Sequence, residues 1–213
     1  HKAAGEPAMS PVPPGVFGFR KEAINRTVYD FVNGQVRRKP IDEAQRLLAE
    51  AGYPGGKGFP RMTYTFFSAA GGAKLHGKVA VELQQMWRDI LSVEIELRQI
   101  ERKVFYSAQS KLDYEISTSS WIGDYNDANT FLDLFMSTSG NNRTGWKNER
   151  YDALIREANQ QTDLEKRAEL FRQAETILIA EEAPIVPLYF YAGFNYYDGD
   201  KIKGIWQNIL DEH

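Results

Sequence analysis

Residues 61–97 read RMTYTFFSAAGGAKLHGKVAVELQQMWRDILSVEIEL, and the spacing of their apolar residues changes twice. The first part, Arg61 to Ser68, is rich in aromatic and β-branched residues and predicts a strand. A long helix follows, with its apolar face at Leu75, Val79, Leu83, Met86 and Ile90. From residue 93 to residue 97 apolar residues alternate with charged ones, which predicts a second strand. The stretch therefore predicts a βαβ unit with a parallel, right-handed crossover.

The alternation of strands and helices continues beyond this unit. A shorter helix is predicted over Glu101 to Ser110 and a third strand over Asp113 to Ser120. The order βαβαβ predicts an α/β domain with a mostly parallel open sheet flanked by helices. Further helices are predicted over 20–32, where the spacing is weak, from Ile41 to Ala51, after Asn148, and from the capping-box sequence Thr162-Asp163-Leu164-Glu165.

Both ends of the chain depart from this alternation. Pro11-Val12-Pro13-Pro14-Gly15 predicts an extended connector along the surface. Near the other end, residues 185–191 and 202–206 predict short strands, the first at a sheet edge or a bulge because Pro187 lacks a hydrogen-bond donor. Because the chain does not begin with Met and has no signal-peptide layout, we expect it to be the interior of a longer protein.

The composition excludes several classes of function. With 29 acidic and 26 basic residues, the net charge of -3 gives no reason to expect nucleic acid or an anionic membrane surface as partner. The absence of cysteine excludes disulfides, thiol catalysis and cysteine-ligated metals. The histidines, His1, His76 and His213, lack metal-ligand spacing, and we expect His76 to face solvent. We therefore predict no metal and no cofactor.

A candidate ligand site follows the third predicted strand, at Trp121-Ile122-Gly123-Asp124-Tyr125. Ligands of open α/β sheets bind beyond the carboxyl ends of the strands, and a carboxylate there can anchor a positively charged group. The residues alone leave alternatives open. Asp124 could instead cap the following turn or helix, and Trp121 and Tyr125 could be packing aromatics rather than walls of a pocket.

Several motifs together resemble one known family, the extracytoplasmic peptide-binding proteins of ABC transporters, solute-binding protein family 5, which includes oligopeptide- and dipeptide-binding proteins. The resemblance covers nearly the whole chain. The matching segments are PVPPG at 11–15, AQRLLAEAGY at 44–53, WIGDY at 121–125, FL at 131–132, NERYDAL at 148–154 and APIVPLY at 183–189.

The resemblance implies the C-terminal lobe of a two-lobed, type II periplasmic-binding-protein fold that encloses a ligand. Residues 1–18 would be the extended connector and 19–190 the ligand-binding lobe. Residues 191–213 would return to the missing N-terminal lobe, so we expect disorder, a changed path or intermolecular pairing there.

The resemblance also implies a function. The parent protein would be a periplasmic or extracellular lipoprotein that captures short peptides and presents them to the membrane permease of an ABC importer. Asp124, in the family's Trp-x-x-Asp motif, would accept the ligand ammonium, with Trp121, Gly123 and Tyr125 beside it. Arg102 would meet a ligand carboxylate, or else be merely solvated. Thr118 stands where one oligopeptide-binding relative has an arginine, which leaves the preference for ligand length open.

Other functions compete with peptide capture. The same fold could bind an oligosaccharide, an opine or a metal chelate, or serve as the sensory module of a regulator. An acid/base pair of Asp124 with Asp127 or Asp133 would suit a glycosidase, but nothing in the sequence arranges these groups around a substrate, so we predict no enzyme and no catalytic residue. The polar loop with Asn141, Asn142, Arg143 and Trp146 could line the cleft, although a solvated loop is the simpler interpretation.

Overall fold

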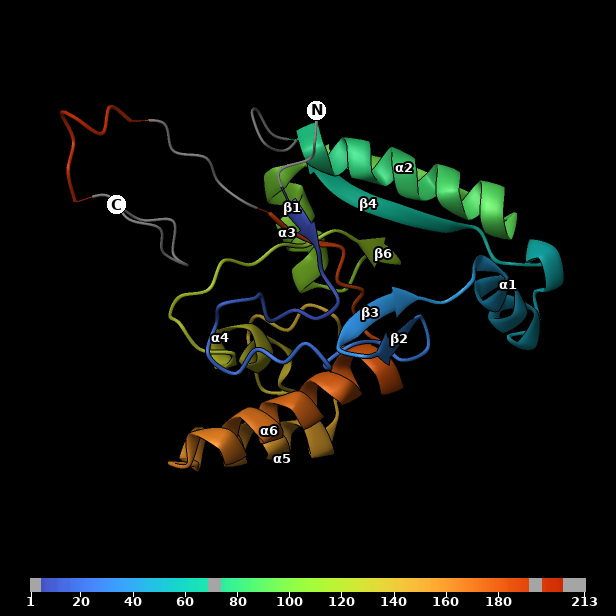
Figure 1. The fold of residues 1–213 in the computed structure, drawn as a ribbon. Coiled ribbons are helices and arrows are strands. Elements are labelled where there is room, and N and C mark those ends of the chain that lie inside the picture. The colour runs from blue at the N-terminus through green and yellow to red at the C-terminus, as the bar shows by residue number, and fades with distance from the viewer. Residues whose placement is uncertain (1–4, 69–73, 192–196, 205–213) are drawn as a thin grey trace. The chain divides into compact units, whose positions relative to one another are not determined.

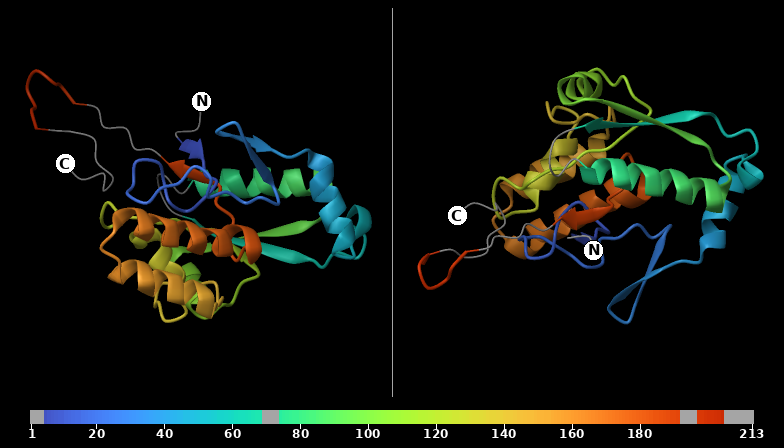
Figure 2. Two further views of the ribbon diagram at one scale, coloured as in Figure 1. Left: turned by 60° about the horizontal axis from the view of Figure 1, so that its bottom comes forward. Right: turned by 90° about the horizontal axis from the view of Figure 1, so that it is seen from above.

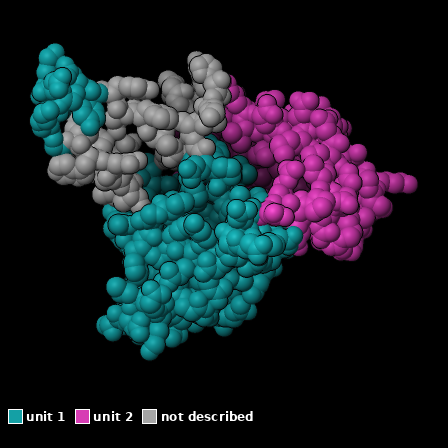
Figure 3. Space-filling view, in the orientation of Figure 1, with its two compact units in different colours: residues 1–36, 121–213 teal, residues 37–120 magenta. Residues whose placement is uncertain are grey.

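The computed structural model describes residues 5–68, 74–191 and 197–204. The chain forms two compact units, which are coloured separately in Figure 3. Unit 1 comprises residues 1–36 and 121–213, and unit 2 comprises residues 37–120. The domain boundaries predicted from the sequence, 1–18, 19–190 and 191–213, stay predictions.

Unit 2 contains a parallel three-stranded sheet with the order β5-β4-β6. The central strand β4 (Met62–Ser68) pairs with β5 (Ile95–Glu101) on one side and with β6 (Ile116–Ser117) on the other. Helix α2 (Lys74–Leu91) connects β4 to β5, and α3 (Arg102–Ser110) connects β5 to β6 (Figure 1). The predicted α/β class with a parallel sheet is confirmed, although the third strand is much shorter than 113–120.

Alternation along β4 explains why helices cover both faces of this sheet. Tyr64 and Phe66 point into the core that the sheet forms with α2. The ring centroids of Tyr64 and of Trp87, which lies on α2, are 6.4 Å apart. Phe67 instead packs against Phe105 of α3, with ring centroids 5.2 Å apart. Figure 2 shows α2 and α3 on opposite sides of the strands. Helix α1 (Ile41–Glu50) and the 3-10 turn η1 (Pro54–Gly56) precede the sheet.

Unit 1 is built around two helices, α5 (Glu149–Gln160) and α6 (Leu164–Thr176), which lie side by side (Figure 1). Helix α6 continues into the π-helical turn η4 (Ile177–Glu181). Asn148 caps α5 as predicted, because its side chain accepts a hydrogen bond from the backbone N–H of Tyr151 at 3.0 Å. The short helix α4 (Asn129–Leu132) and the 3-10 turn η3 (Asp133–Phe135) complete the helical part.

The N-terminal extended segment does not run along the surface as predicted. Val12 exposes 0% of its surface and Val16 exposes 5%, and both belong to the core formed with α4, α5 and α6. The prolines lack backbone N–H donors, so regular secondary structure does not hold this segment in place. Burial of its valine side chains in the helical core stabilises its position instead.

The helix predicted over residues 20–32 is wrong. The segment forms turns and then β2 (Tyr29–Val32), which pairs with β3 (Gln35–Arg38). The connecting residues Asn33 and Gly34 have φ values of 52° and 73°, the left-handed conformation that two-residue hairpin turns require. The side chains of residues 29–32 are alternately half-buried and exposed, as in a strand. This alternation, together with the turn, favours a hairpin over the weakly spaced helix.

The last described strand is β7 (Tyr189–Tyr191), which pairs antiparallel with β1 (Gly5–Pro7). It begins after Pro187, in agreement with the predicted edge position. Residues 202–204 form no strand, and the rest of the predicted strand at 202–206, like much of the C-terminal segment expected to change its path, lies outside the described residues. No helix in the described part of the chain is long and apolar enough to cross a membrane.

Candidate functional site

The loop that carries Asp124 is tied to the first turn of α4. The Asp124 N–H donates to the Thr130 hydroxyl oxygen at 3.0 Å, and the same hydroxyl lies 3.5 Å from Asp124 Oδ2. Thr130 exposes 2% of its surface, whereas Asp124 is exposed. Asp124 does not cap α4, because it is Asp127 that accepts the Asn129 N–H, at 2.9 Å. The buried Thr130 side chain therefore fixes the backbone at Asp124, while the carboxylate itself is exposed.

Gly123 is buried against α4. A Cβ atom at this position would lie 2.9 Å from Cζ of Phe131 and 3.2 Å from Cγ2 of Thr130. Distances this short leave no room for any side chain. The glycine lets the loop approach the helix closely enough for Thr130 to reach Asp124.

Trp121 and Tyr125 flank the carboxylate on the protein surface. Trp121 exposes 38% of its surface and Tyr125 exposes 45%, so neither is a core aromatic. The Tyr125 hydroxyl oxygen accepts a hydrogen bond from Asn129 Nδ2 at 2.9 Å, which leaves its own proton available as a donor. Their contact with a ligand stays a prediction.

The three carboxylates near α4 have different environments. Asp127 forms an ion pair with Arg167, and their side chains expose only 17% and 16%. Asp133 accepts from Asn129 Nδ2 at 3.2 Å, and its pKa is raised by burial and by the charge of Asp124. Within residues 5–68, 74–191 and 197–204 no lysine or arginine pairs with Asp124. Asp124 is thus the exposed, uncompensated carboxylate of the group.

Arg102 is the first residue of α3, directly after β5, and belongs to unit 2 rather than to the unit that carries Asp124. Its guanidinium carbon lies 5.8 Å from the ring centroid of Phe67 and 5.6 Å from that of Tyr106. These are weak cation–π contacts of an exposed side chain. Arg102 therefore places a solvent-exposed positive charge at the carboxyl end of the parallel sheet.

The expectation that His76 faces solvent is wrong. Its ring is half-buried, 4.9 Å from the ring of Phe67, and Nδ1 lies 3.5 Å from the Thr118 hydroxyl. Burial lowers the pKa of His76. The sequence offered no signal for this arrangement, because the partners lie on β4 and just after β6, far from His76 along the chain.

The loop with Asn141, Asn142, Arg143 and Trp146 is more ordered than a solvated loop. The Asn142 side-chain amide donates to the carbonyl oxygens of Phe135, Met136 and Trp146, at 2.9 to 3.3 Å. The Trp146 ring packs edge-on against Tyr151 at 5.1 Å. These contacts fold the loop back onto the helical core.

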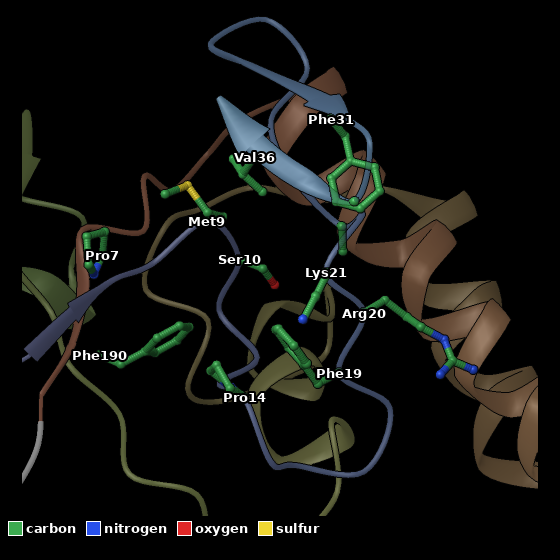
Figure 4. A pocket seen from close by; sticks show the side chains of 12 residues that line it. Pro7, Met9, Ser10, Pro14, Phe19, Arg20, Lys21, Phe31, Val36 and Phe190 are labelled. Atoms are coloured by element: carbon green, nitrogen blue, oxygen red, sulfur yellow. The ribbon is translucent and has the colours of Figure 1, made fainter. Parts of the chain in front are cut away.

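Unit 1 also contains an open cavity of about 210 Å³, away from the predicted site residues. Its wall combines aromatic and aliphatic side chains such as Phe19, Phe31 and Phe190 with the polar Ser10 (Figure 4). Arg20 extends away from it and pairs with Glu165 at 2.7 Å. No cluster of three potential metal ligands occurs among the described residues.

Comparison with known proteins gives consistent matches. Residues 2–143 match the family described as bacterial extracellular solute-binding proteins, family 5 middle. The oligopeptide-binding protein OppA of Bacillus subtilis is 34% identical over 93% of this chain and 35% of its own length. The probable deoxycholate-binding periplasmic protein YgiS of Escherichia coli is 36% identical over 86% of this chain and 32% of its own length.

A solved structure extends the match to the fold. The crystal structure of a periplasmic oligopeptide-binding protein from Borrelia burgdorferi superposes with a TM-score of 0.77 at 27% identity, covering 98% of this chain and 39% of that chain. The predicted type II periplasmic-binding-protein fold is thereby confirmed. The chain spans about a third of the length of the curated relatives it matches.

Proposed function

The chain belongs to the bacterial extracellular solute-binding proteins of family 5, and from this premise we propose that it is part of a protein that captures short peptides for an ABC importer. Asp124 accepts the terminal ammonium group of the peptide. The relatives named as oligopeptide-binding proteins support the ligand class. The location that follows is periplasmic or extracellular, with the parent protein anchored to the membrane as a lipoprotein.

The observation that carries the proposal is the environment of Asp124. Its backbone is fixed by Thr130, and its carboxylate is exposed and free of any cation among the described residues. Neighbouring Asp127, by contrast, is neutralised by Arg167. A carboxylate on a fixed backbone and without a counter-ion is suited to a charge-assisted hydrogen bond from an ammonium group, especially when a second lobe excludes water from it.

The other predicted residues take supporting roles in this proposal. Trp121 and Tyr125 are exposed next to Asp124 and supply flat apolar contact and a hydroxyl donor for the peptide backbone. Arg102, exposed beside Phe67 and Tyr106, supplies a positive charge for a ligand carboxylate. The N-terminal lobe would provide the opposite wall, and the closed state bound to ligand would be presented to the permease.

A different solute is the second candidate, favoured by the 36% identity to a probable deoxycholate-binding protein. Deoxycholate is an anion, so an uncompensated carboxylate at Asp124 would repel its charged end. The chemistry at Asp124 therefore favours a cationic group. An oligosaccharide, an opine, a metal chelate or a sensory role remain outcomes for the test to separate.

Binding without turnover is part of the proposal. A glycosidase would need both Asp124 and Asp127 to reach the substrate. Asp127 is not available for this role, because it pairs with Arg167 and accepts a hydrogen bond from the Asn129 N–H. No cofactor, metal or nucleic acid enters the proposed function.

Calorimetry on the full-length protein tests the role of Asp124. Trialanine should bind, and Asp124→Ala should weaken its binding about 100-fold, as expected for loss of a buried charge-assisted contact. N-acetyl-trialanine, which lacks the ammonium group, should bind weakly to both proteins. Equal losses for the free and acetylated peptides would reject the ammonium contact, and native mass spectrometry of co-purified ligand would then identify the solute class.

A further inference from the structure

The turn between β2 and β3 contains a pair of residues with a known chemical reactivity. Asn33 is the one asparagine of the sequence that is followed by glycine. The backbone nitrogen after an asparagine can attack the side-chain amide, and glycine hinders this attack least because it has no Cβ. The product is a succinimide ring, and hydrolysis of the ring gives aspartate or isoaspartate. The pair Asn33-Gly34 therefore has the chemistry of a deamidation site.

The structure leaves both reacting groups accessible. Asn33 and Gly34 are exposed, and a Cβ atom on Gly34 would meet nothing within 4 Å. Within residues 5–68, 74–191 and 197–204, the Asn33 side chain and the Gly34 N–H form no hydrogen bond. No side chain has to move aside, and neither group has to give up a partner, before the Gly34 nitrogen attacks.

The hairpin also opens easily. The ring closes only when rotation about the Cα–C bond of Asn33 brings the Gly34 nitrogen towards Cγ, so the turn has to leave its folded conformation briefly. Strands β2 and β3 have four residues each and form a two-stranded sheet. A two-stranded hairpin is marginally stable by itself, and local openings of this kind cost little free energy. The fold therefore offers Asn33 weak protection.

We propose that Asn33 is a site of spontaneous deamidation, at which ageing protein gains a carboxylate and an isoaspartate link. The Gly34 nitrogen loses its proton to hydroxide and forms a bond with Cγ of Asn33. The Cγ–Nδ2 bond breaks, and Nδ2 takes a proton from water and leaves as ammonia. One water molecule then opens the ring. Attack of this water at Cγ gives aspartate, and attack at the backbone carbonyl carbon of residue 33 gives isoaspartate.

The two products affect the hairpin differently. Aspartate adds a negative charge to an exposed turn and leaves the backbone unchanged. Isoaspartate carries the main chain through Cβ and Cγ, so it adds one carbon to a two-residue turn whose length sets the register of β2 and β3. Phe31 and Val36 from these strands, together with Gly34, line the open cavity of unit 1 (Figure 4). Isoaspartate at residue 33 therefore loosens the strand pairing and the wall of that cavity.

Asn141 is a control within the same chain. It is exposed, as Asn33 is, but the next residue, Asn142, has a side chain. The Asn142 N–H, whose nitrogen would have to attack, donates to the Ser139 carbonyl oxygen at 3.1 Å. The Asn142 side-chain amide also donates to three backbone carbonyl oxygens. Deamidation at Asn141 requires these contacts to break, so it should be much slower than at Asn33.

Peptide mass spectrometry of the full-length protein tests the proposal. Folded protein is incubated at mildly alkaline pH, and the peptide with residue 33 is followed by the mass gained when OH replaces NH₂. A parallel sample in concentrated urea gives the rate in the unfolded chain. We expect the rate at Asn33 in the folded protein to lie within about tenfold of the rate in urea. The rate at Asn141 should fall much further below its rate in urea.

Two variants complete the test. Asn33→Gln keeps a side-chain amide but would have to form a larger ring, so its product at residue 33 should be lost. Asn141→Gln is the matched control and should deamidate at Asn33 as wild type does. Hydrogen exchange of the backbone over residues 29–38 measures the consequence for the hairpin. Aged wild type should lose protection there, whereas Asn33→Gln incubated for the same time should keep it.

Contrary results are equally clear. If Asn33 reacts in urea but not in the folded protein, or if Asn33 and Asn141 react equally fast in the folded protein, the hairpin is not a deamidation site and the proposal fails. If isoaspartate forms at residue 33 while hydrogen exchange over residues 29–38 stays unchanged, the proposed loosening of the hairpin is overturned. Neither result bears on the ligand contact proposed for Asp124.

Discussion

The hydroxyl of Ser10 donates a hydrogen bond to the carboxyl group of Glu175, 165 residues further along the chain. Both side chains are buried, and the other Glu175 oxygen has no hydrogen-bond partner within the described residues. Burial raises the pKa of Glu175 to about 8, with the Ser10 hydrogen bond and Arg172 opposing the rise and Glu22 adding to it. The neutral acid thus joins the N-terminal extended segment to α6.

The stability of the fold should fall as pH rises because of Glu175. Between the ordinary carboxyl pKa, about 4.3, and about 8, the folded protein keeps a proton that the unfolded chain has lost. The free energy of unfolding therefore decreases with pH, at most by about 1.4 kcal/mol per pH unit from this group. Glu175→Gln, which stays neutral, should be more stable than wild type at pH 8 and similar at pH 5.

Urea unfolding of both proteins at the two pH values checks this. Glu157→Gln, which removes an exposed carboxylate from α5, serves as the control and should follow wild type at both pH values. A parallel loss of stability by Glu175→Gln and wild type between pH 5 and pH 8 would contradict the prediction.

Substitution of Gly123 should displace the loop that carries Asp124. In Gly123→Ala the new Cβ meets the Phe131 ring and the Thr130 methyl group, and such overpacking costs about 1 to 3 kcal/mol in the free energy of unfolding. Trialanine affinity should also fall, because Thr130 no longer reaches Asp124. Thermal unfolding and calorimetry measure the two effects.

A second substitution tests whether the loss of affinity in Gly123→Ala is caused by the steric clash with Phe131. Phe131→Leu makes space opposite residue 123, so the double variant should recover part of the ligand affinity lost in Gly123→Ala. Gly140→Ala, where an added Cβ meets nothing within 4 Å, is the matched control and should change neither property. Failure of Phe131→Leu to restore any affinity would argue against the close approach.

The Asp127–Arg167 ion pair should contribute to stability far more than a surface pair does. Asp127→Asn keeps an oxygen for the Asn129 N–H but leaves the Arg167 guanidinium, 16% exposed, without its counter-ion. We expect a loss of about 2 to 4 kcal/mol in the free energy of unfolding. Chemical denaturation of Asp127→Asn, Arg167→Met and the double variant gives the coupling energy.

The comparison pair is Arg61 and Glu96, whose side chains expose 86% and 64%. Glu96→Gln should change the free energy of unfolding by less than about 0.5 kcal/mol, because solvent screens this pair. Similar losses for Asp127→Asn and Glu96→Gln would show that burial of the first pair does not matter.

Local patterns in the sequence predicted much of the fold. The βαβαβ order of unit 2 and the Asn148 cap were correct because each depends on residues close together in the chain. The helix over 20–32 was wrong because a hairpin turn at Asn33-Gly34 and alternating burial compete with a weak helical spacing. The buried path of Val12 depends on α6, which no local pattern near Val12 reveals.

At the candidate site, too, local features were predicted correctly and contacts between distant residues were not. A strand end followed by Gly123-Asp124 suggested an anchor, and the structure gives that carboxylate an ordered, exposed position. No local pattern in the sequence predicts the ion pair of Asp127, because Arg167 lies 40 residues away. His76 was misplaced for a similar reason, since Phe67 lies on β4 and Thr118 just after β6, both far from His76 along the chain.

The order of residues in the two units has a consequence for folding. Unit 2 is one continuous segment, residues 37–120, so its sheet can assemble without waiting for residues 121–213. Val12 and Val16 precede that segment in the sequence, but water is excluded from them only when α6, which follows it, has packed. Until then these apolar side chains stay exposed, so the segment that carries them is a place where a partly folded chain can aggregate.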